Sequence, residues 1–345
     1  MLDARAWGDR NTTACRGCFK GMPGHSGGRP VQFIHVPKTG GTSVQKLLHR
    51  EVVALRVAFE VVSDRDLHEG QKTTWKGATC VVFGHAPLGW SPGFQVRQPL
   101  YIAVFRDPVA FAVSSFDFIK VRASRDWVAV EASSRPLRLP PRVCSRPHQY
   151  HGVAHADPVR DAVHAKFGNL SISDNVVGLN PVVLALVRDK QAAFLFGSSF
   201  GRKECALHSP AYAALRHHEA PNAHALNLAT FYDEEPLPGG TAECALHLLS
   251  SVDLVGVTER LDDLLVQLRW RTGWMGMSAK VAANGTATVP HSNHIDLSFK
   301  STLTPQAKLI MDREASKGID SQVYRRAVEL NKAKTEEAAR CLDSA

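Results

Sequence analysis

Residues 33–43, FIHVPKTGGTS, carry a short apolar strand signal that leads into a turn of glycines and hydroxyl side chains and then into a helix signal. Such a turn presents backbone N–H groups to an anion, and the positive end of the helix dipole adds to the attraction. Gly40 and Gly41 let the backbone approach an anion without an intervening Cβ. Lys38 adds a mobile positive charge, and Thr42 and Ser43 add hydroxyl donors. The segment predicts a cradle for a phosphorylated ligand.

The order of residues separates this turn from the nucleoside-triphosphate pattern, in which the lysine follows the last glycine. Here Lys38 precedes the glycine pair. The string VPKTGGTS closely resembles the 5′-phosphosulfate loop of the Golgi carbohydrate sulfotransferases, the group that holds the heparan sulfate 2-O- and 6-O-sulfotransferases. These enzymes move a sulfuryl group from 3′-phosphoadenosine-5′-phosphosulfate (PAPS) to a sugar hydroxyl. The resemblance implies that PAPS contacts the turn through Lys38, Thr39, Gly40, Gly41, Thr42 and Ser43.

A second segment, FRDPVAFAVSSF at residues 105–116, predicts a strand end with an arginine at the carboxyl edge, followed by a helix. Ligands in open α/β sheets bind beyond the carboxyl ends of the strands, and the planar fork of Arg106 suits a phosphate. The segment resembles the family's 3′-phosphate site, R-D-P-x-x-R-x-x-S, so Arg106 and Ser114 are the implied ligands. Phe111 stands where many members have a second arginine.

His85 follows a buried strand signal and Gly84, which places it at the same predicted sheet edge. Imidazole accepts a proton near neutral pH, and the Gly-His step resembles the family segment that supplies the catalytic base. We therefore expect His85 to deprotonate the acceptor hydroxyl. Lys38 is expected to neutralise the charge that develops on the leaving oxygen. His35, inside the first strand signal, is expected to be a buried, hydrogen-bonded residue instead.

Two later segments also match the family. Residues 255–262, VGVTERLD, resemble the family's v-G-v-t-E-r-l-e segment and predict a strand, with Thr258 as helix N-cap and Asp262 in the first turn. Asp320 and Tyr324 fit the family's C-terminal D-x-x-x-Y pattern.

Alternating strand and helix signals predict an α/β fold: a P-loop-like parallel sheet flanked by helices, with a loop-rich insertion and a helical C-terminus. We expect a flexible leader over residues 1–30 and a sulfotransferase domain over 31–340, with the insertion at about 124–192. Strands are expected at 31–36, 80–83, 100–105 and 254–257, and helices at 42–50, 108–119, 192–200, 211–218, 259–270 and, broken near Gly318, 306–339.

The net charge of +8 and a pI near 9.2 favour an anionic partner. The basic residues are scattered and no nucleic-acid-binding motif is present, so we expect a glycan acceptor, anionic or neutral, and no nucleic acid. No metal is expected. Cys15 and Cys18 form one isolated C-x-x-C pair, and His148, His151 and His155 lack partners at ligand spacing.

The expected cellular location follows from sorting and modification signals. No apolar run is long enough to span a membrane, and no secretory signal is found, although members of the family are membrane-anchored. The chain is therefore expected to be a lumenal fragment, a truncated sequence or an unanchored protein. Three N-glycosylation sequons, at Asn11, Asn169 and Asn284, suit the Golgi lumen that the resemblance implies. The oligomeric state stays open.

Other functions stay open at this point. A P-loop kinase would need magnesium and a nucleoside triphosphate, and the reversed Lys/Gly order disfavours it. A non-catalytic glycan-binding relative would bind polysaccharide without PAPS, which the retained Lys38, His85, Arg106 and Ser114 disfavour. A sulfotransferase for protein tyrosine or lipid, and a plain glycine turn with a solvated lysine, are the remaining alternatives.

Overall fold

The computed structural model describes residues 31–54, 59–62, 81–84, 88, 99–123, 170–188, 190–196, 242–272 and 301–343. The strands are β1 (Val31–Ile34), β2 (Phe59–Val62), β3 (Val81–Gly84), β4 (Leu100–Phe105) and β5 (Leu254–Val257). The helices are α1 (Gly41–Ala54), α3 (Pro108–Ala123), α6 (Ile172–Val177), α7 (Pro181–Ala185), α8 (Lys190–Phe196), α12 (Ala242–Ser250), α13 (Leu261–Thr272), α14 (Pro305–Ala315) and α15 (Ile319–Asp343), with a short 3₁₀ helix, η4 (Thr258–Arg260), before α13.

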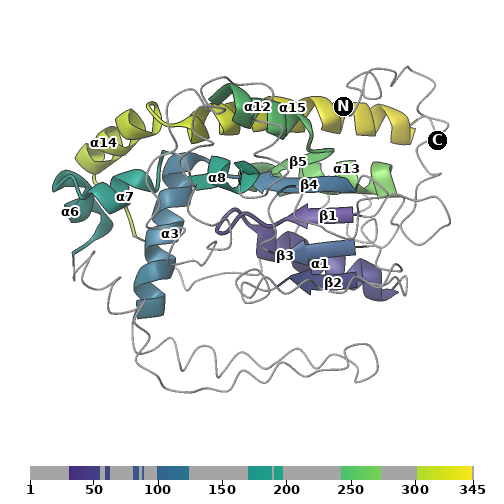
Figure 1. The fold of residues 1–345 in the computed structure, drawn as a ribbon, viewed down its shortest axis with the longest axis horizontal. Coiled ribbons are helices and arrows are strands. Elements are labelled where there is room, and N and C mark those ends of the chain that lie inside the picture. The colour runs from purple at the N-terminus through teal and green to yellow at the C-terminus, as the bar shows by residue number, and fades with distance from the viewer. Residues whose placement is uncertain are drawn as a thin grey trace, which may run out of the picture.

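The strands form one sheet in the order β2-β3-β1-β4-β5, and each neighbouring pair is parallel (Figure 1). Strands β1, β4 and β5 are buried along their whole length, as expected for parallel strands covered on both faces. The sheet and its flanking helices confirm the α/β class, and the long α15 confirms the helical C-terminus.

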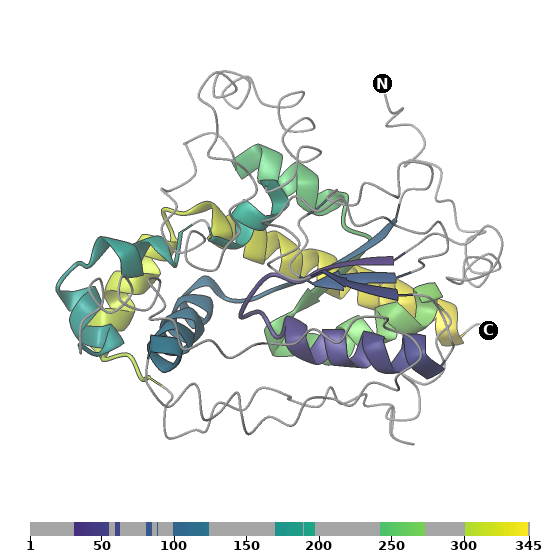
Figure 2. The same ribbon diagram turned by 60° about the horizontal axis from the view of Figure 1, so that its bottom comes forward.

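Three large apolar clusters make up most of the core among the described residues, and a small one joins Trp270 of α13 to the end of α15. Helices α1 and α13 pack on one face of the sheet, and α8, α12 and α15 pack on the other. Figure 2 shows α1, in purple, and α12, in green, on opposite sides of the strands. The third cluster lies beyond the carboxyl ends of the strands and joins α3, α6, α7 and α14.

The predicted strands at 100–105 and 254–257 have the observed bounds, and the break in the C-terminal helix falls between Ala315 and Ile319. Gly318 is needed at this break because an added Cβ would lie 2.3 Å from the carbonyl oxygen of Arg188. Strand β2 and helix α12 were not predicted from the sequence. Residues 170–188, the described part of the predicted loop-rich insertion outside α8, contain α6 and α7. The leader at 1–30 and the predicted helix at 211–218 lie outside the described residues.

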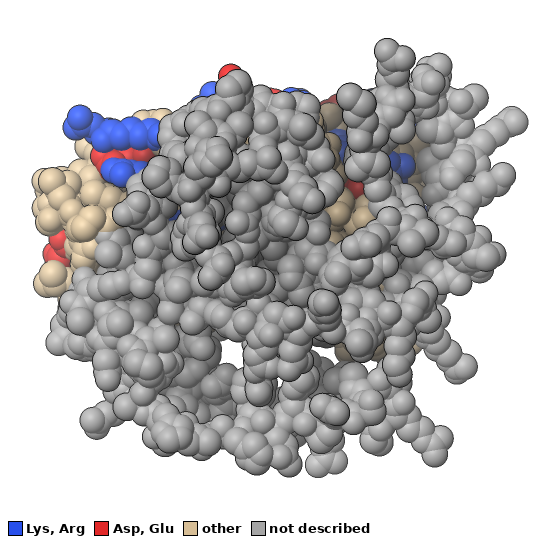
Figure 3. Space-filling model, in the orientation of Figure 1, with Lys and Arg blue, Asp and Glu red and all other residues tan. Residues whose placement is uncertain are grey.

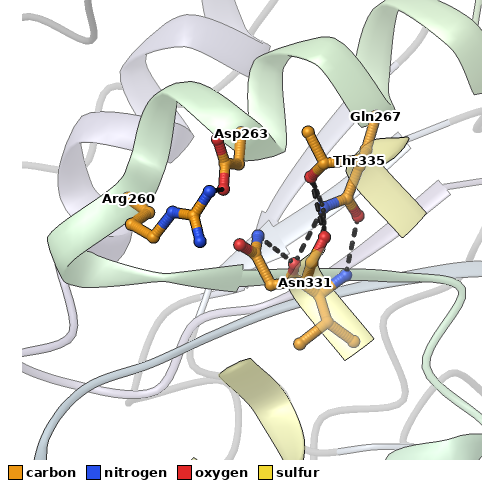
Figure 4. A network of polar contacts seen from close by, with 6 residues as sticks. Arg260, Asp263, Gln267, Asn331 and Thr335 are labelled. Carbon is orange, nitrogen blue, oxygen red and sulfur yellow. Dashed lines mark hydrogen bonds and ion pairs between the residues drawn. The ribbon is translucent and has the colours of Figure 1, made fainter. Parts of the chain in front are cut away.

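Strand β5 forms one edge of the sheet in the described part of the chain, and side chains bond to its outer side where a further strand would pair (Figure 4). The side-chain amide of Gln267 in α13 accepts from Val255 N at 3.2 Å and donates to Val255 O at 3.1 Å. Asn331 of α15 donates to the same oxygen at 2.9 Å. The Thr335 hydroxyl accepts from Gln267 Nε2 and donates to Asn331 O, which links α13 to α15. Gln267 thus provides the donor and the acceptor that a neighbouring strand would supply, which a buried backbone requires.

We predict that Gln267→Met lowers the free energy of unfolding by about 2 kcal/mol, because methionine fills the volume but leaves the buried Val255 N–H without its acceptor. The matched control is Gln322→Met, at an exposed position of α15, which should change stability by less than about 0.5 kcal/mol. Urea denaturation of both variants measures the difference. Equal stability of the two variants would contradict the role given to Gln267.

Candidate anion-binding site

The topology defines one place on the sheet edge where a ligand is expected. From β1 the chain continues through α1 toward β2, whereas from β4 it continues toward β5 on the opposite side, and β1 and β4 are neighbours. The gap beyond their carboxyl ends is therefore the topological switch point, where open α/β sheets bind ligands. Lys38 follows β1 and Arg106 follows β4, so both predicted phosphate-binding residues lie at this switch point.

The turn between β1 and α1 is held by donors from neighbouring strand ends. The Arg106 Nη1 atom donates to Lys38 O at 3.1 Å, and Thr258 Oγ1 donates to Thr39 O at 2.7 Å. Lys38 and Gly40 have positive φ, +62° and +81°. Within the described part of the chain, the N–H groups of residues 38–42 find no acceptor. The carbonyl oxygens of the turn are thus satisfied, while a row of N–H groups at the start of α1 remains open to an anion.

Lys38 and Arg106 place two partly buried cations beside each other. Burial, followed by the charge of Arg106, lowers the pKa of Lys38 to about 8, and Asp117 only partly offsets this. The Lys38 ammonium lies 4.2 Å from the ring centroid of Phe118 in α3, a cation–π contact. Burial also lowers the pKa of Arg106, against the opposing effect of Glu259. The Nε atom of Arg106 is buried and has no hydrogen-bond partner among the residues that the structure describes. An anion bound at this position would favour the charged forms of Lys38 and Arg106 and would give Arg106 Nε an acceptor.

Each glycine of the turn has a structural reason beyond access for a ligand. Gly40 adopts a left-handed backbone conformation that favours glycine. At Gly41 an added Cβ would lie 2.0 Å from the ring of His35. His35 is 7% exposed, its Nδ1 atom contacts Gln45 Oε1 at 3.2 Å, and its ring stacks on Phe33. The prediction of a buried, hydrogen-bonded His35 is confirmed, and its packing explains Gly41.

The three hydroxyl residues of the turn differ in what they offer. Thr39 is fully buried and its hydroxyl donates to Val36 O at 2.8 Å, so its backbone N–H is the group left for a ligand. Ser43 is 6% exposed in the first turn of α1. Thr42 is half-buried at the start of the helix, next to the open N–H groups. Thr42 is therefore the hydroxyl best placed for a ligand.

Ser114 and Phe111 both lie in α3, but on surfaces with different surroundings. Ser114 is half-buried, and among the described residues no hydrogen bond joins it to Arg106 or Lys38. Phe111 is fully buried in the apolar cluster of α3, α6, α7 and α14. The side chain at the position where the resembled 3′-phosphate pattern has a second arginine is therefore a core residue.

His85 lies outside the described residues, so its predicted role stays a prediction. The residue before it, Gly84, ends β3 and pairs with Ile34 of β1. Gly84 has φ +139°, and its carbonyl oxygen accepts from His35 N at 3.0 Å. The strand that leads to His85 is thus next to the strand that leads to Lys38.

Several residues at the site were missed or misassigned in the sequence analysis. Thr258 was predicted to be a helix N-cap, and this is wrong: it begins the 3₁₀ helix, and Val257 takes the cap position without a side-chain hydrogen bond. The Thr258 hydroxyl, which follows β5, bonds instead to Thr39 O after β1 and to Phe105 O at the end of β4. Asp262 is in the first turn of α13 as predicted. Gln191 bonds to the backbone of Arg106, and no sequence signal marks it.

Asp320 and Tyr324, the two residues of the C-terminal pattern, make structural contacts. Asp320 accepts hydrogen bonds from the first turn of α8. Tyr324 OH donates to Glu259 Oε2 at 3.0 Å, and Glu259 Oε1 accepts from Asp107 N at 3.4 Å. Burial and the charge of Glu259 raise the pKa of Tyr324. The start of α15 is therefore tied to the strand ends beside Arg106.

Several other charged groups on the described surface form ion pairs. In Figure 3, Lys and Arg side chains alternate with Asp and Glu at the end of the molecule where α14 lies. In α14, Lys308 pairs with Asp312 at 2.6 Å, and Glu314 pairs with Arg188 and Lys317. Among the described residues, no group of three metal-ligating side chains is found. No described helix has both the length and the apolar character required to cross a membrane.

No protein-family model matches the chain, and no curated protein matches it.

Proposed function

We propose that this chain is a PAPS-dependent sulfotransferase that moves a sulfuryl group to a carbohydrate hydroxyl. The observation that carries the proposal is the juxtaposition of Lys38 and Arg106 at the switch point, beneath the open N–H groups of residues 38–42. A ligand with phosphate groups on two sides of a nucleoside suits two such cations from two strand ends. The position of Lys38 before the glycines favours PAPS over a nucleoside triphosphate.

In this proposal the sheet is P-loop-like, and each site residue has a defined task. The N–H groups of residues 38–42 bind the 5′-phosphosulfate, and Arg106 and Ser114 bind the 3′-phosphate. His85 takes the proton of the acceptor hydroxyl as its oxygen attacks sulfur. The bond between sulfur and the 5′-phosphate oxygen breaks, and 3′,5′-adenosine bisphosphate leaves with the negative charge that Lys38 offsets. The reaction needs no metal, since protein cations balance the charge.

We propose the Golgi lumen as the site of action and a polysaccharide or glycan, neutral or anionic, as acceptor. The net charge of +8 supports an anionic partner. Cys244 in α12 is disulfide-bonded, which supports an oxidising compartment. Ser171 is the third residue of the sequon at Asn169 and the N-cap of α6, and it lies exposed at the surface.

We predict that binding of 3′,5′-adenosine bisphosphate takes up protons near pH 8. The lowered pKa of Lys38, about 8, leaves only part of the molecules charged at that pH. A bound anion favours the charged form and raises this pKa, so affinity falls as pH rises from about 7 to about 10. Titration calorimetry in two buffers of different ionisation enthalpy measures the uptake. Lys38→Met is the control and should take up none near pH 8; equal uptake by both proteins would contradict the role of Lys38.

The activity test uses radiolabelled PAPS with a panel of glycosaminoglycan, galactan and small-alcohol acceptors. We expect label transfer without added metal, and we expect His85→Ala to lose about two to four orders of magnitude in turnover while still binding 3′,5′-adenosine bisphosphate. The wild-type rate should rise with pH through the imidazole pKa. Transfer from a nucleoside triphosphate with magnesium would instead show a kinase. Polysaccharide binding without PAPS binding would show a glycan-binding protein. An active His85→Ala enzyme with the wild-type pH profile would place the base elsewhere.

A further inference from the structure

The backbone of Arg106 lies one residue past the end of β4, where the sheet no longer supplies it with partners. Its N–H and C=O are both bonded by the side-chain amide of Gln191 in α8: Arg106 N donates to Gln191 Oε1 at 2.8 Å, and Gln191 Nε2 donates to Arg106 O at 2.8 Å. Gln191 is 1% exposed. One side chain therefore fixes both polar groups of the residue whose guanidinium contacts Lys38 O.

Gln191 is held in turn by a buried carboxylate from the C-terminal helix. Asp320, at the start of α15, is fully buried, and its two oxygens accept from Gln191 N at 2.8 Å and from Ala192 N at 2.7 Å. The N–H of Asp320 donates to Arg188 O at 2.8 Å, just before α8. A buried carboxylate needs such donors, and the helix dipole of α8 adds to its stabilisation. Asp320 thereby fixes the position of the first turn of α8.

We propose that Gln191 is a positioning residue for Arg106 and that Asp320 sets Gln191 in place, so that the C-terminal helix orients the cation at the switch point. This inference rests on the proposed function, in which Arg106 binds the 3′-phosphate of the nucleotide. Neither Gln191 nor Asp320 is assigned a contact with the ligand. Their effect passes through the Arg106 backbone, which sets the direction from which the guanidinium reaches Lys38 O.

The molecule supplies its own control for this proposal. Gln267 makes the same pair of bonds, to Val255 N and Val255 O, and is also fully buried (Figure 4). Val255 pairs with Ala103 of β4, within the sheet, whereas Arg106 follows the end of that strand. Replacing either glutamine by methionine removes a backbone clamp of the same chemistry. Only one of these clamps acts on a residue of the candidate site.

The experiment measures binding of two ligands to Gln191→Met and Gln267→Met by calorimetry. Both variants should lose similar stability, but Gln191→Met should lose about 10- to 100-fold in affinity for 3′,5′-adenosine bisphosphate, the range for a misplaced charged hydrogen bond. Its affinity for 5′-AMP, which lacks the 3′-phosphate, should change less than about twofold. Gln267→Met should bind both ligands like the wild type. Equal loss by the two variants, or no loss in Gln191→Met, overturns the proposal.

A conservative variant tests whether the loss comes from the clamp itself. In Gln191→Glu an ionised carboxylate accepts from Arg106 N but repels Arg106 O, whereas a protonated one restores the donor. Burial raises the pKa of such a carboxyl group. The affinity of Gln191→Glu for 3′,5′-adenosine bisphosphate, relative to that of the wild type, should therefore recover as pH falls from about 8 to about 6. A ratio that does not change with pH contradicts the clamp. Failure of the wild type to bind 3′,5′-adenosine bisphosphate at all would overturn the proposed function, and this inference with it.

Discussion

The hydrogen bonding of backbone groups where parallel strands end is the constraint on which this site depends. Beyond Ile34, Phe105 and Val257 the sheet stops, yet the chain stays packed, so carbonyl oxygens there need other donors. The Thr258 hydroxyl lies within hydrogen-bond distance of both Thr39 O and Phe105 O, and the Arg106 guanidinium donates to Lys38 O. Because these donors occupy the carbonyl side of the turn, the N–H side remains open, and the polarity of the site follows from the way the sheet edge is closed.

The second consequence is electrostatic. The hydrogen bond from Arg106 to Lys38 O brings the two cations together. Burial disfavours both charges, and the charge of Arg106 further lowers the pKa of Lys38. The positive φ of Lys38 adds local strain, which is typical of functional turns. Asp117 and Glu259 compensate only in part. Such a site is preorganised for an anion, because the cost of assembling its cations is met when the chain folds and not when the ligand binds.

Residue order and apolar runs were sufficient to predict the parallel sheet, the turn at Lys38 and the location of Arg106 beside it. The same information predicted a buried His35, but not its packing against Gly41, which had been explained only by the approach of an anion. Contacts between distant segments were not predictable. Thr258 was expected to cap its own helix but bonds to residues more than 150 positions away, and the clamps of Gln191 and Gln267 arise only when α8 and α13 reach the sheet. A glutamine that replaces a strand partner has no sequence signature, since propensity and periodicity report local structure.

The most direct test of the central claim is a crystal structure of the chain with bound 3′,5′-adenosine bisphosphate. The 5′-phosphate should lie against the N–H groups of residues 38–42 with Lys38 beside it. The 3′-phosphate should accept a hydrogen bond from the Arg106 guanidinium, whose Nε atom has no partner among the described residues. A nucleotide bound elsewhere on the sheet, or one whose 3′-phosphate has no contact with Arg106, would contradict the assignment of the switch point as a PAPS site.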